Sequence, residues 1–360
     1  CVPPLDRLTS KGAAVTTMVE TRALTGGVDT HSEVHVAAVI DHLGGVLGVE
    51  SFNVDSAGYV ALTDWMCSFG DIGLVGVEGT GSYGAGLARH LARAGLSVVE
   101  VDRPNRQERA RTGKSDPLDA IGAARAAQCG RAFGLAKTRD GDVEAIRNLL
   151  VARRSAAESR VKALNQIRQL VFTGPDELRE RFVDVPSWRI AEGVAALRVH
   201  ADVDVVRMAA KTALATLGRR AVALRSEVER LDAQIGWLVM NVAPDLVELV
   251  GVGSHTAAVL LAAAGDNPGR MRSEATWAKL CGVAPLAASS GKVTRHRLNR
   301  GGDRQANHAL WIVVMARMAC HPPTKAYLAR RLAEGKSKRE VIRVLKRYVA
   351  REVYRYLPRA

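Results

Sequence analysis

The first hundred residues of this 360-residue chain contain short runs rich in β-branched residues, and these runs constrain the fold more than any other feature. Three of them lie at 26–29, 34–40 and 46–54 with only short turns between them, which predicts an antiparallel meander. Two more apolar runs, 74–78 and 96–101, alternate with helical stretches. Strands that alternate with helices after a meander predict a mixed α/β sheet.

The middle of the chain has a helical pattern. In residues 142–170, and again in about 205–240, apolar residues recur at helical spacing, and glycine and proline interrupt this pattern at 174–188. Two long helices around a break predict an antiparallel hairpin or coiled coil, or else an ordinary helical spacer without a partner.

The last third is expected to be mainly α-helical. Residues 246–265 indicate a helix, a tight glycine turn and a second helix, and 305–320 indicate a helix that ends at His321-Pro322-Pro323. Between them, 283–304 is expected to be a loop rich in Ser, Gly, Lys and Arg, and a basic helix is expected at about 337–353.

These patterns divide the chain into five segments. They are an uncertain or disordered lead-in (1–24), a sheet domain (25–135), the helical hairpin or coiled coil (140–242), a C-terminal domain (243–335) and a basic C-terminal helix (336–360).

Positive charge is concentrated at the end of the chain. The net charge is +14, and residues 292–360 alone contain 18 Lys or Arg against 4 Asp or Glu. Such a block favours a polyanion as partner, with nucleic acid ahead of a membrane surface. The alternative explanation of this charge is a basic proteome from a GC-rich genome, in which arginine simply replaces lysine.

The spacing of the cysteines and the hydropathy of the chain argue against several classes of protein. The 5 cysteines are scattered without a CxxC pair, so neither a disulfide framework nor a zinc site is indicated, and a cytoplasmic protein is expected. The longest apolar stretch, 257–264, is far shorter than the roughly 18 residues that span a bilayer, so no membrane is expected as a partner.

Acidic residues occupy the ends of predicted strands and the start of a predicted helix. Asp29 closes the first strand in GVDTH (27–31), and Glu78 closes a later one in VEG. Asp116 and Asp119 lie three apart beside Pro117, which suits the first turn of a helix, so the two acids share one face. Carboxylate oxygens in such a set suit Mg²⁺, with Mn²⁺ as an alternative, and phosphoryl transfer.

Three of the four acids also have an ordinary structural interpretation. Asp116 could be a helix N-cap, Asp119 a solvated side chain and Asp29 a turn residue. His31 beside Asp29 either touches the site or has a structural role. The four acids in this order are far more specific than any one of them.

The motifs GVDTH (27–31), VEGTGSYG (77–84) and KSDPLDA (114–120) resemble those of the DEDD transposases of insertion sequences. The resemblance implies an RNase H-like (RuvC-like) sheet in which Asp29, Glu78, Asp116 and Asp119 hold magnesium. It continues through 249–266, which resembles a helix-hairpin-helix-like segment, and covers about residues 25–330.

A second signature of the same family resembles residues 281–310. It is matched here by Gly282-Val283-Ala284-Pro285, Ser290-Gly291-Lys292 and Gly302-Asp303-Arg304, with Val283 where the family usually has Leu. The resemblance implies that Ser290 attacks DNA and forms a covalent phosphoserine link; Ser289 is the alternative register. The alternative from the residues alone is a flexible basic loop with incidental serines.

Several residues around this serine are candidate contacts to nucleic acid. Cationic side chains could hold the phosphodiester and stabilise the charge that develops on it. The glycine turn at 251–253 could present backbone N–H groups to a phosphate, or could simply be a tight connector. The set comprises Gly251, Gly253, Lys292, Arg295, Arg297, Arg300 and Arg304.

The sequence therefore predicts a transposase that cuts and rejoins DNA. The family resemblance further implies a structured guide RNA and a homo-oligomer, a dimer or tetramer. Two alternatives stay open: a RuvC-like endonuclease that uses metal-activated water, and a nucleic-acid-binding protein without catalysis.

Overall fold

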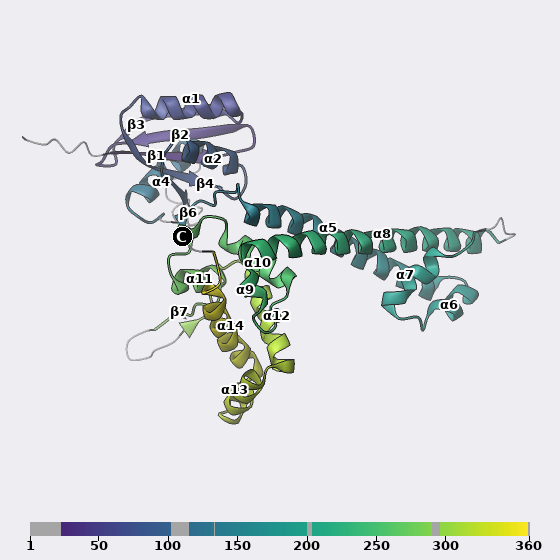
Figure 1. Cartoon of the computed structure of the whole chain (residues 1–360). Coiled ribbons are helices and arrows are strands. Elements are labelled where there is room, and N and C mark those ends of the chain that lie inside the picture. The colour runs from purple at the N-terminus through teal and green to yellow at the C-terminus, as the bar shows by residue number, and fades with distance from the viewer. Residues whose placement is uncertain (1–22, 102–114, 133, 200–203, 290–295, 359–360) are drawn as a thin grey trace, which may run out of the picture. The chain divides into compact units, whose positions relative to one another are not determined.

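The computed structural model describes residues 23–101, 115–132, 134–199, 204–289 and 296–358 (Figure 1). The chain divides into two compact units, Cys1–Ala136 and Lys137–Ala360, and each is described by itself.

The first unit is built on a mixed sheet with the strand order β3-β2-β1-β4-β5-β6. The strands are β1 (Leu24–Thr30), β2 (Val34–Ile40), β3 (Val46–Asn53), β4 (Ile72–Glu78), β5 (Val98–Val101) and β6 (Gly134–Leu135). The first three form the predicted antiparallel meander, while β4 runs parallel to β1 and β5 parallel to β4. The predicted mixed α/β sheet is confirmed, and it is consistent with an RNase H-like fold. The two-residue edge strand β6 was not predicted.

Helices cover both faces of this sheet. One face packs against α1 (Ser56–Cys67) and α2 (Ala85–Arg93) through Leu62, Met66, Leu87 and Leu91. The other face receives α4 (Asp116–Gln128), whose contact residues are small: Ala120, Ala123 and Ala127. Small side chains on both surfaces allow α4 to lie unusually close to the strands.

The second unit begins with two long helices that run antiparallel, α5 (Asp142–Thr173) and α8 (Val205–Val242) (Figure 1). The start of α5 shares a core with the end of α8, and the end of α5 packs with the start of α8. Arg153 of α5 donates two hydrogen bonds to Asp232 of α8, at 2.9 and 3.0 Å.

The expected break at 174–188 is wrong in part, because the segment contains α6 (Asp176–Phe182) and the start of α7 (Ser187–Ala195). Pro175 and Pro186 are the N-cap residues of these helices, where the missing N–H of proline costs nothing. Prolines interpreted as breaks therefore mark new helix starts.

The rest of the second unit is mainly helical, as predicted. Its helices are α9 (Pro244–Val247), α10 (Ser254–Ala264), the 3-10 turn Pro268–Arg270, α11 (Glu274–Leu280), α12 (Arg304–Cys320), α13 (Pro322–Ala333) and α14 (Lys338–Tyr354). Helix α12 ends at the predicted place, but Pro322 and Pro323 open α13, a helix that was not predicted. The segment at 283–304 contains a short ladder of β7 (Leu286–Ala287) and β8 (His296–Arg297) rather than loop alone.

None of the helices in the described part of the chain is both long and apolar enough to cross a lipid bilayer.

Candidate metal centre

Asp29 and Glu78 lie at the same edge of the sheet because β1 and β4 run parallel. Val28 of β1 is paired with Val77 of β4, so the acid that follows each valine lies at the carboxyl end of its strand. Both side chains are buried. The hydroxyl of Thr30 donates a hydrogen bond of 2.8 Å to the carbonyl oxygen of Glu78 and ties the two strand ends together.

Helix α4 brings two more acids to this edge. Its N-cap is Ser115, so Asp116 is the first helical residue and the interpretation of Asp116 as an N-cap is wrong. Asp116 and Asp119 lie in the first turn, where the helix dipole favours negative charge, and Pro117 fits there because its nitrogen needs no hydrogen bond.

Glycines in the strands set how closely α4 approaches. A Cβ atom on Gly27 would lie 2.2 Å from the backbone nitrogen of Ala124 and 2.3 Å from the carbonyl oxygen of Ala120. A Cβ atom on Gly76 would lie 2.5 Å from the carbonyl oxygen of Ala123. The backbone of α4 therefore rests directly on β1 and β4, and this close packing positions the first turn of α4.

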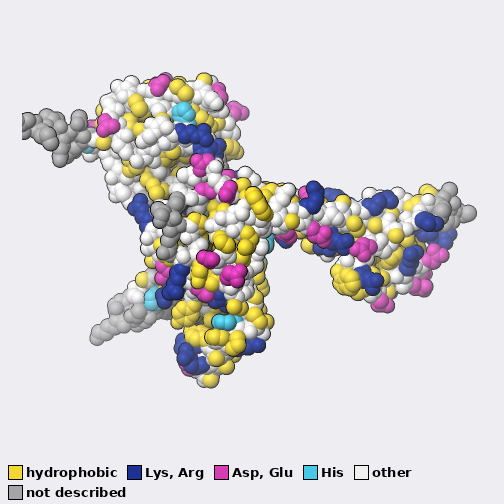
Figure 2. Space-filling view, in the orientation of Figure 1, with side chains coloured by type: hydrophobic (Ala, Val, Ile, Leu, Met, Phe, Trp, Pro, Cys, Tyr) yellow, Lys and Arg dark blue, Asp and Glu magenta, His cyan; other side chains and the backbone are white. Residues whose placement is uncertain are grey.

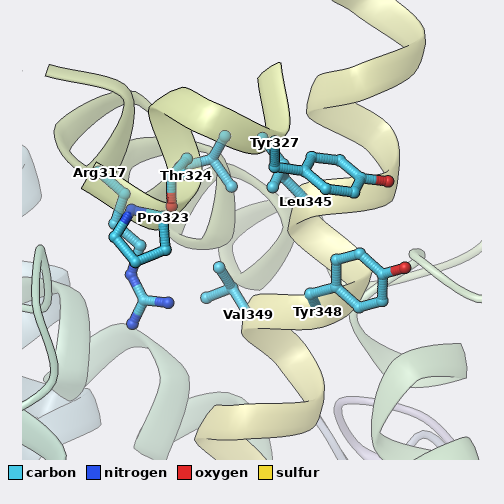
Figure 3. A pocket seen from close by; sticks show the side chains of 8 residues that line it. Arg317, Pro323, Thr324, Tyr327, Leu345, Tyr348 and Val349 are labelled. Atoms are coloured by element: carbon cyan, nitrogen blue, oxygen red, sulfur yellow. The ribbon is translucent and has the colours of Figure 1, made fainter. Parts of the chain in front are cut away.

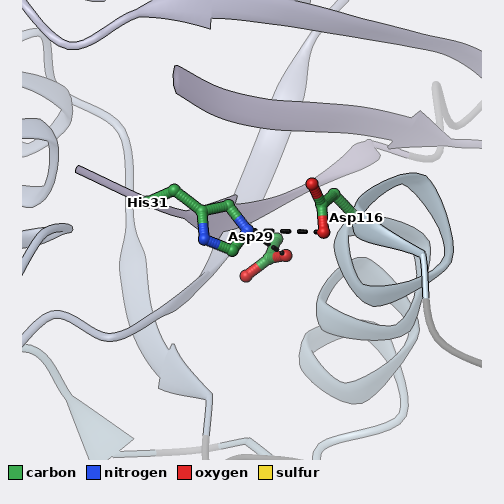
Figure 4. A group of neighbouring side chains, drawn as sticks. All are labelled: Asp29, His31 and Asp116. Carbon is green, nitrogen blue, oxygen red and sulfur yellow. Dashed lines mark hydrogen bonds and ion pairs between the residues drawn. The ribbon is translucent and has the colours of Figure 1, made fainter. Parts of the chain in front are cut away.

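Asp29, His31 and Asp116 form a compact cluster at this edge (Figure 4). Nε2 of His31 lies 3.1 Å from Oδ2 of Asp29 and 3.5 Å from Oδ1 of Asp116. The three potential ligand atoms all lie within 4.8 Å of one another. The Asp29 side chain is 9% exposed, whereas those of His31 and Asp116 are 46% and 49% exposed. The cluster thus has a buried carboxylate with two solvent-accessible groups beside it.

The electrostatics of Asp29 are unfavourable in the absence of a cation. Burial raises the pKa of Asp29, the neighbouring His31 lowers it, and the negative charges of Asp119 and Asp116 raise it again. The net direction is upward. A bound cation would compensate both the lost hydration and the repulsion between carboxylates.

The other two predicted acids, Glu78 and Asp119, are not members of this three-residue cluster. Among the described residues, the set that can share one ion is Asp29, His31 and Asp116. Asp119 lies one helical turn after Asp116 and is close enough to influence Asp29 electrostatically. Glu78 ends the neighbouring strand.

His31 joins the acids more directly than the sequence indicated. His31 lies two residues after Asp29 and directly follows the end of β1, so it is near the same edge of the sheet. That spacing was the available signal for including His31.

The predicted serine and part of its basic surroundings lie outside the described residues, which exclude Ser290, Gly291, Lys292 and Arg295. Arg297 lies in β8, Arg300 follows it, and Arg304 opens α12; all three are exposed. These three are available for contacts.

The base of the segment from 281 to 304 is fastened by close backbone contacts. A Cβ atom on Gly302 would lie 2.3 Å from the nitrogen of Gly282, so the two strands of backbone touch. Nδ2 of Asn307 donates to the carbonyl oxygen of Cys281 at 2.8 Å, and Nζ of Lys346 donates to Oδ1 of Asn307 at 2.8 Å. The ends of this segment are therefore held by α12 and α14.

The two glycines of the turn before α10 have different surroundings. Gly251 has a φ of +82°, and a Cβ atom there would lie 3.2 Å from both Cβ of Ala316 and the carbonyl oxygen of Val313. This geometry is that of a tight connector packed on α12. Gly253 is exposed at the N-cap of α10, with open space around it.

Comparison with known proteins agrees with this architecture. A family model of DEDD transposases of IS110, described as "Transposase", matches residues 26–173, and a second, "Transposase IS116/IS110/IS902 family", matches residues 244–329. The chain belongs to this family of transposases.

A curated relative of this chain is the "Insertion element IS110 uncharacterized 43.6 kDa protein" of Streptomyces coelicolor. The two are 28% identical over 199 residues, which is 54% of this chain and 47% of the relative. The matched region thus spans about half the length of that relative.

The two matched regions of the chain correspond to the two groups of candidate residues. The first contains the four acids and His31, and the second contains the glycine turn before α10 and the segment at 281–304.

Proposed function

We propose that this transposase cuts and rejoins DNA strands at a site that holds a divalent cation, Mg²⁺ or Mn²⁺, between Asp29 and Asp116. The observation that carries the proposal is the convergence of the buried Asp29 carboxylate with Asp116 and His31 at the edge of the sheet. On this proposal residues 25–135 form the metal-binding domain, and 243–335 form a second catalytic domain.

The donor set fits a small divalent cation. Carboxylate oxygens suit Mg²⁺ and Mn²⁺, and an imidazole nitrogen favours Mn²⁺ more than Mg²⁺. The raised pKa of Asp29 reflects a negative charge that the fold alone does not compensate. Asp119 and Glu78 offer further carboxylates near the same edge. Bound there, the cation would bind phosphate oxygens of the DNA and neutralise the charge that develops on them.

Ser290 is proposed to act as the nucleophile. Its hydroxyl oxygen attacks the phosphorus of a phosphodiester, a phosphoserine ester forms, and the departing deoxyribose oxygen takes up a proton. A free DNA hydroxyl then attacks the phosphoserine and restores the serine, so the strand is rejoined without an external energy source. Lys292, Arg295, Arg297, Arg300 and Arg304 are proposed to hold the phosphodiester.

The same family membership supports a proposal for the partners of this chain. We propose DNA as the substrate, a structured RNA as the guide, and a homo-oligomer, dimer or tetramer, as the active form. The excess of Lys and Arg in residues 292–360 supports a large contact with nucleic acid.

Titration of the purified full-length protein with Mn²⁺, followed by calorimetry, tests the metal site. We expect Asp116→Asn and Asp29→Asn to weaken Mn²⁺ binding at least tenfold. Asp64→Asn is the matched control, because Asp64 is an exposed acid on α1 of the same unit. Equal affinity of wild type and Asp116→Asn would refute the proposed site.

Trapping of a protein–DNA adduct on a denaturing gel tests the serine. We expect the adduct to disappear in Ser290→Ala and to persist in Ser289→Ala. Cleavage by Ser290→Ala without any adduct would instead support a nuclease that uses water. An adduct that survives in Ser290→Ala would assign the nucleophile to another residue.

A further inference from the structure

Helices α12, α13 and α14 enclose an open pocket of about 200 Å³ (Figure 3). Its wall is mostly apolar and aromatic. The lining residues are Val314, Arg317, Pro323, Thr324, Tyr327, Leu345, Tyr348 and Val349. The metal centre described above uses none of them.

Two tyrosines form one side of this pocket. The rings of Tyr327 and Tyr348 meet edge to face, with centroids 5.8 Å apart and planes at 83°. Tyr348 is 48% exposed although it lies beside an apolar wall, and Figure 3 shows the two rings side by side. An exposed aromatic face next to an apolar pocket offers a stacking surface for a flat ring.

Positive charge lies next to the tyrosines. The guanidinium carbons of Arg330 and Arg331 are 5.3 and 6.0 Å from the centroid of Tyr327. Both arginines form ion pairs with the single carboxylate of Glu334, so one positive charge of the two remains uncompensated by it. Figure 2 shows basic and apolar side chains next to one another at the end of the second unit that α13 forms.

Arg317 has a different role from these arginines. Its side chain is buried, Nε donates to the carbonyl oxygen of Val250 at 2.7 Å, and Nη1 donates to Glu352 at 2.6 Å. These contacts occupy the Arg317 guanidinium, so it stabilises the pocket wall and is not the group that a ligand's anion would meet.

We propose that this pocket binds the base of an unpaired nucleotide, stacked on Tyr348, with the adjacent phosphate on Arg330 and Arg331. The proposal rests on the proposed function only in taking nucleic acid as the partner. A dry cavity of about 150 Å³ is enough for a benzene ring, so the size suits one base. Stacking on aromatic side chains beside a cationic track is how proteins bind single strands. A paired base inside a duplex cannot enter, so the ligand is single-stranded RNA or DNA.

Fluorescence anisotropy with the full-length protein tests the pocket. The probes are single-stranded RNA and DNA of the same pyrimidine-rich sequence, each with one 2-aminopurine. We expect Tyr348→Leu to weaken single-strand binding about tenfold and to abolish quenching of the 2-aminopurine. Tyr348→Phe, which keeps the ring, should bind as wild type. The tighter of the two strands identifies which nucleic acid supplies the nucleotide.

The control variant is Trp237→Leu, because Trp237 is an exposed aromatic on α8 outside the pocket. It should leave single-strand binding unchanged. Unchanged affinity and quenching in Tyr348→Leu would overturn the proposal, and so would an equal loss of duplex binding. The probe titrations are made in EDTA, where the proposed metal site holds no cation, so failure of the metal site and failure of the pocket give different results.

Discussion

Asp29 combines two properties that pull in opposite directions, a buried position and a negative charge. Burial and the neighbouring carboxylates raise its pKa, which means that the folded state disfavours the ionised form that a metal ligand needs. The ionised carboxylate therefore lowers the free energy of unfolding at neutral pH, and the proposed cation would offset this cost.

Replacing that carboxylate with an amide of the same shape should therefore raise the stability of the metal-free protein and weaken metal binding. In the presence of EDTA, we expect Asp29→Asn to unfold at a temperature a few degrees higher than wild type, on the order of 1 kcal/mol. Added Mn²⁺ should stabilise wild type and leave Asp29→Asn unchanged. Differential scanning fluorimetry with and without the metal measures both effects, and metal stabilisation of the variant would contradict the assignment.

His35 is a buried histidine in the same unit, and it predicts an acid-sensitive fold. It is fully buried on β2, stacks on Tyr59 at 5.8 Å, and neither ring nitrogen has a hydrogen-bond partner among the described residues. Burial lowers its pKa, and the charge of His31 acts in the same direction. The unfolded chain therefore binds a proton more readily than the folded chain below about pH 6.5.

The free energy of unfolding should accordingly fall as the pH drops below about 6.5, and level off below the folded pKa. We expect His35→Phe, which keeps an aromatic ring against Tyr59, to reduce this slope by at most about 1.4 kcal/mol per pH unit. Urea unfolding at a series of pH values measures it, with the exposed His42→Gln as control. A slope unaltered in His35→Phe would show that other groups cause the acid sensitivity.

At the scale of single residues, the sequence indicated the positions of Asp29 and Asp116 better than that of their neighbour His31. Asp29 and Asp116 lie in one cluster, as expected. Their positions could be predicted because the ends of strands and the start of a helix leave a local pattern in the sequence. The sequence leaves a structural role open for His31, because its contact with Asp116 joins two segments far apart in the chain. Contacts of that kind depend on tertiary packing.

At the scale of elements, the packing of α4 on β1 decides whether the cluster exists. Gly27 leaves no space for a Cβ atom against the backbone of Ala120 and Ala124. We expect Gly27→Ala to lower the unfolding free energy by about 3 kcal/mol. It should also weaken Mn²⁺ binding without changing any ligand, because α4 carries Asp116.

Gly122→Ala provides the matched comparison on α4 itself. A Cβ atom there meets nothing within 4 Å, so alanine should stabilise the helix by roughly 0.5–1 kcal/mol and leave Mn²⁺ binding intact. Calorimetry on both variants checks the pair. Normal metal affinity in Gly27→Ala would mean that α4 reaches the site without this close approach.

Three helices that the sequence patterns did not predict share one cause. Helices α6, α7 and α13 all start at or beside prolines, which were interpreted as the end of helical structure. Proline is compatible with a first helical turn and incompatible with later ones, so it marks a boundary without saying on which side the helix lies. The long helices α5 and α8 could be predicted because apolar residues recur at helical spacing over many turns.

At the scale of the whole molecule, positive charge is concentrated in the last fifth of the chain. Residues 292–360 contain 18 of the 51 Lys and Arg residues and 4 of the 37 Asp and Glu residues. Three exposed cations, Lys338, Arg339 and Arg343, lie on the N-terminal half of α14. Lys338 and Arg339 occupy its first turn, where positive charge opposes the helix dipole and contributes nothing to folding.

Neutralising these three cations should therefore weaken nucleic-acid binding without loss of stability. Each phosphate contact contributes about 0.9 to the slope of log affinity against log salt on duplex DNA, so the triple glutamine variant should lose about 2 to 3 from that slope. Binding of a fixed duplex measured from low to high salt gives the slope. A variant with Arg89→Gln and Arg93→Gln, on α2 of the first unit, controls for the loss of positive charge in general when the change in slope is compared per charge removed. Equal slopes in wild type and the α14 variant would place the nucleic acid on another surface. A decrease of the same size per charge in both variants would instead mean that long-range attraction, and not contact with α14, causes the effect.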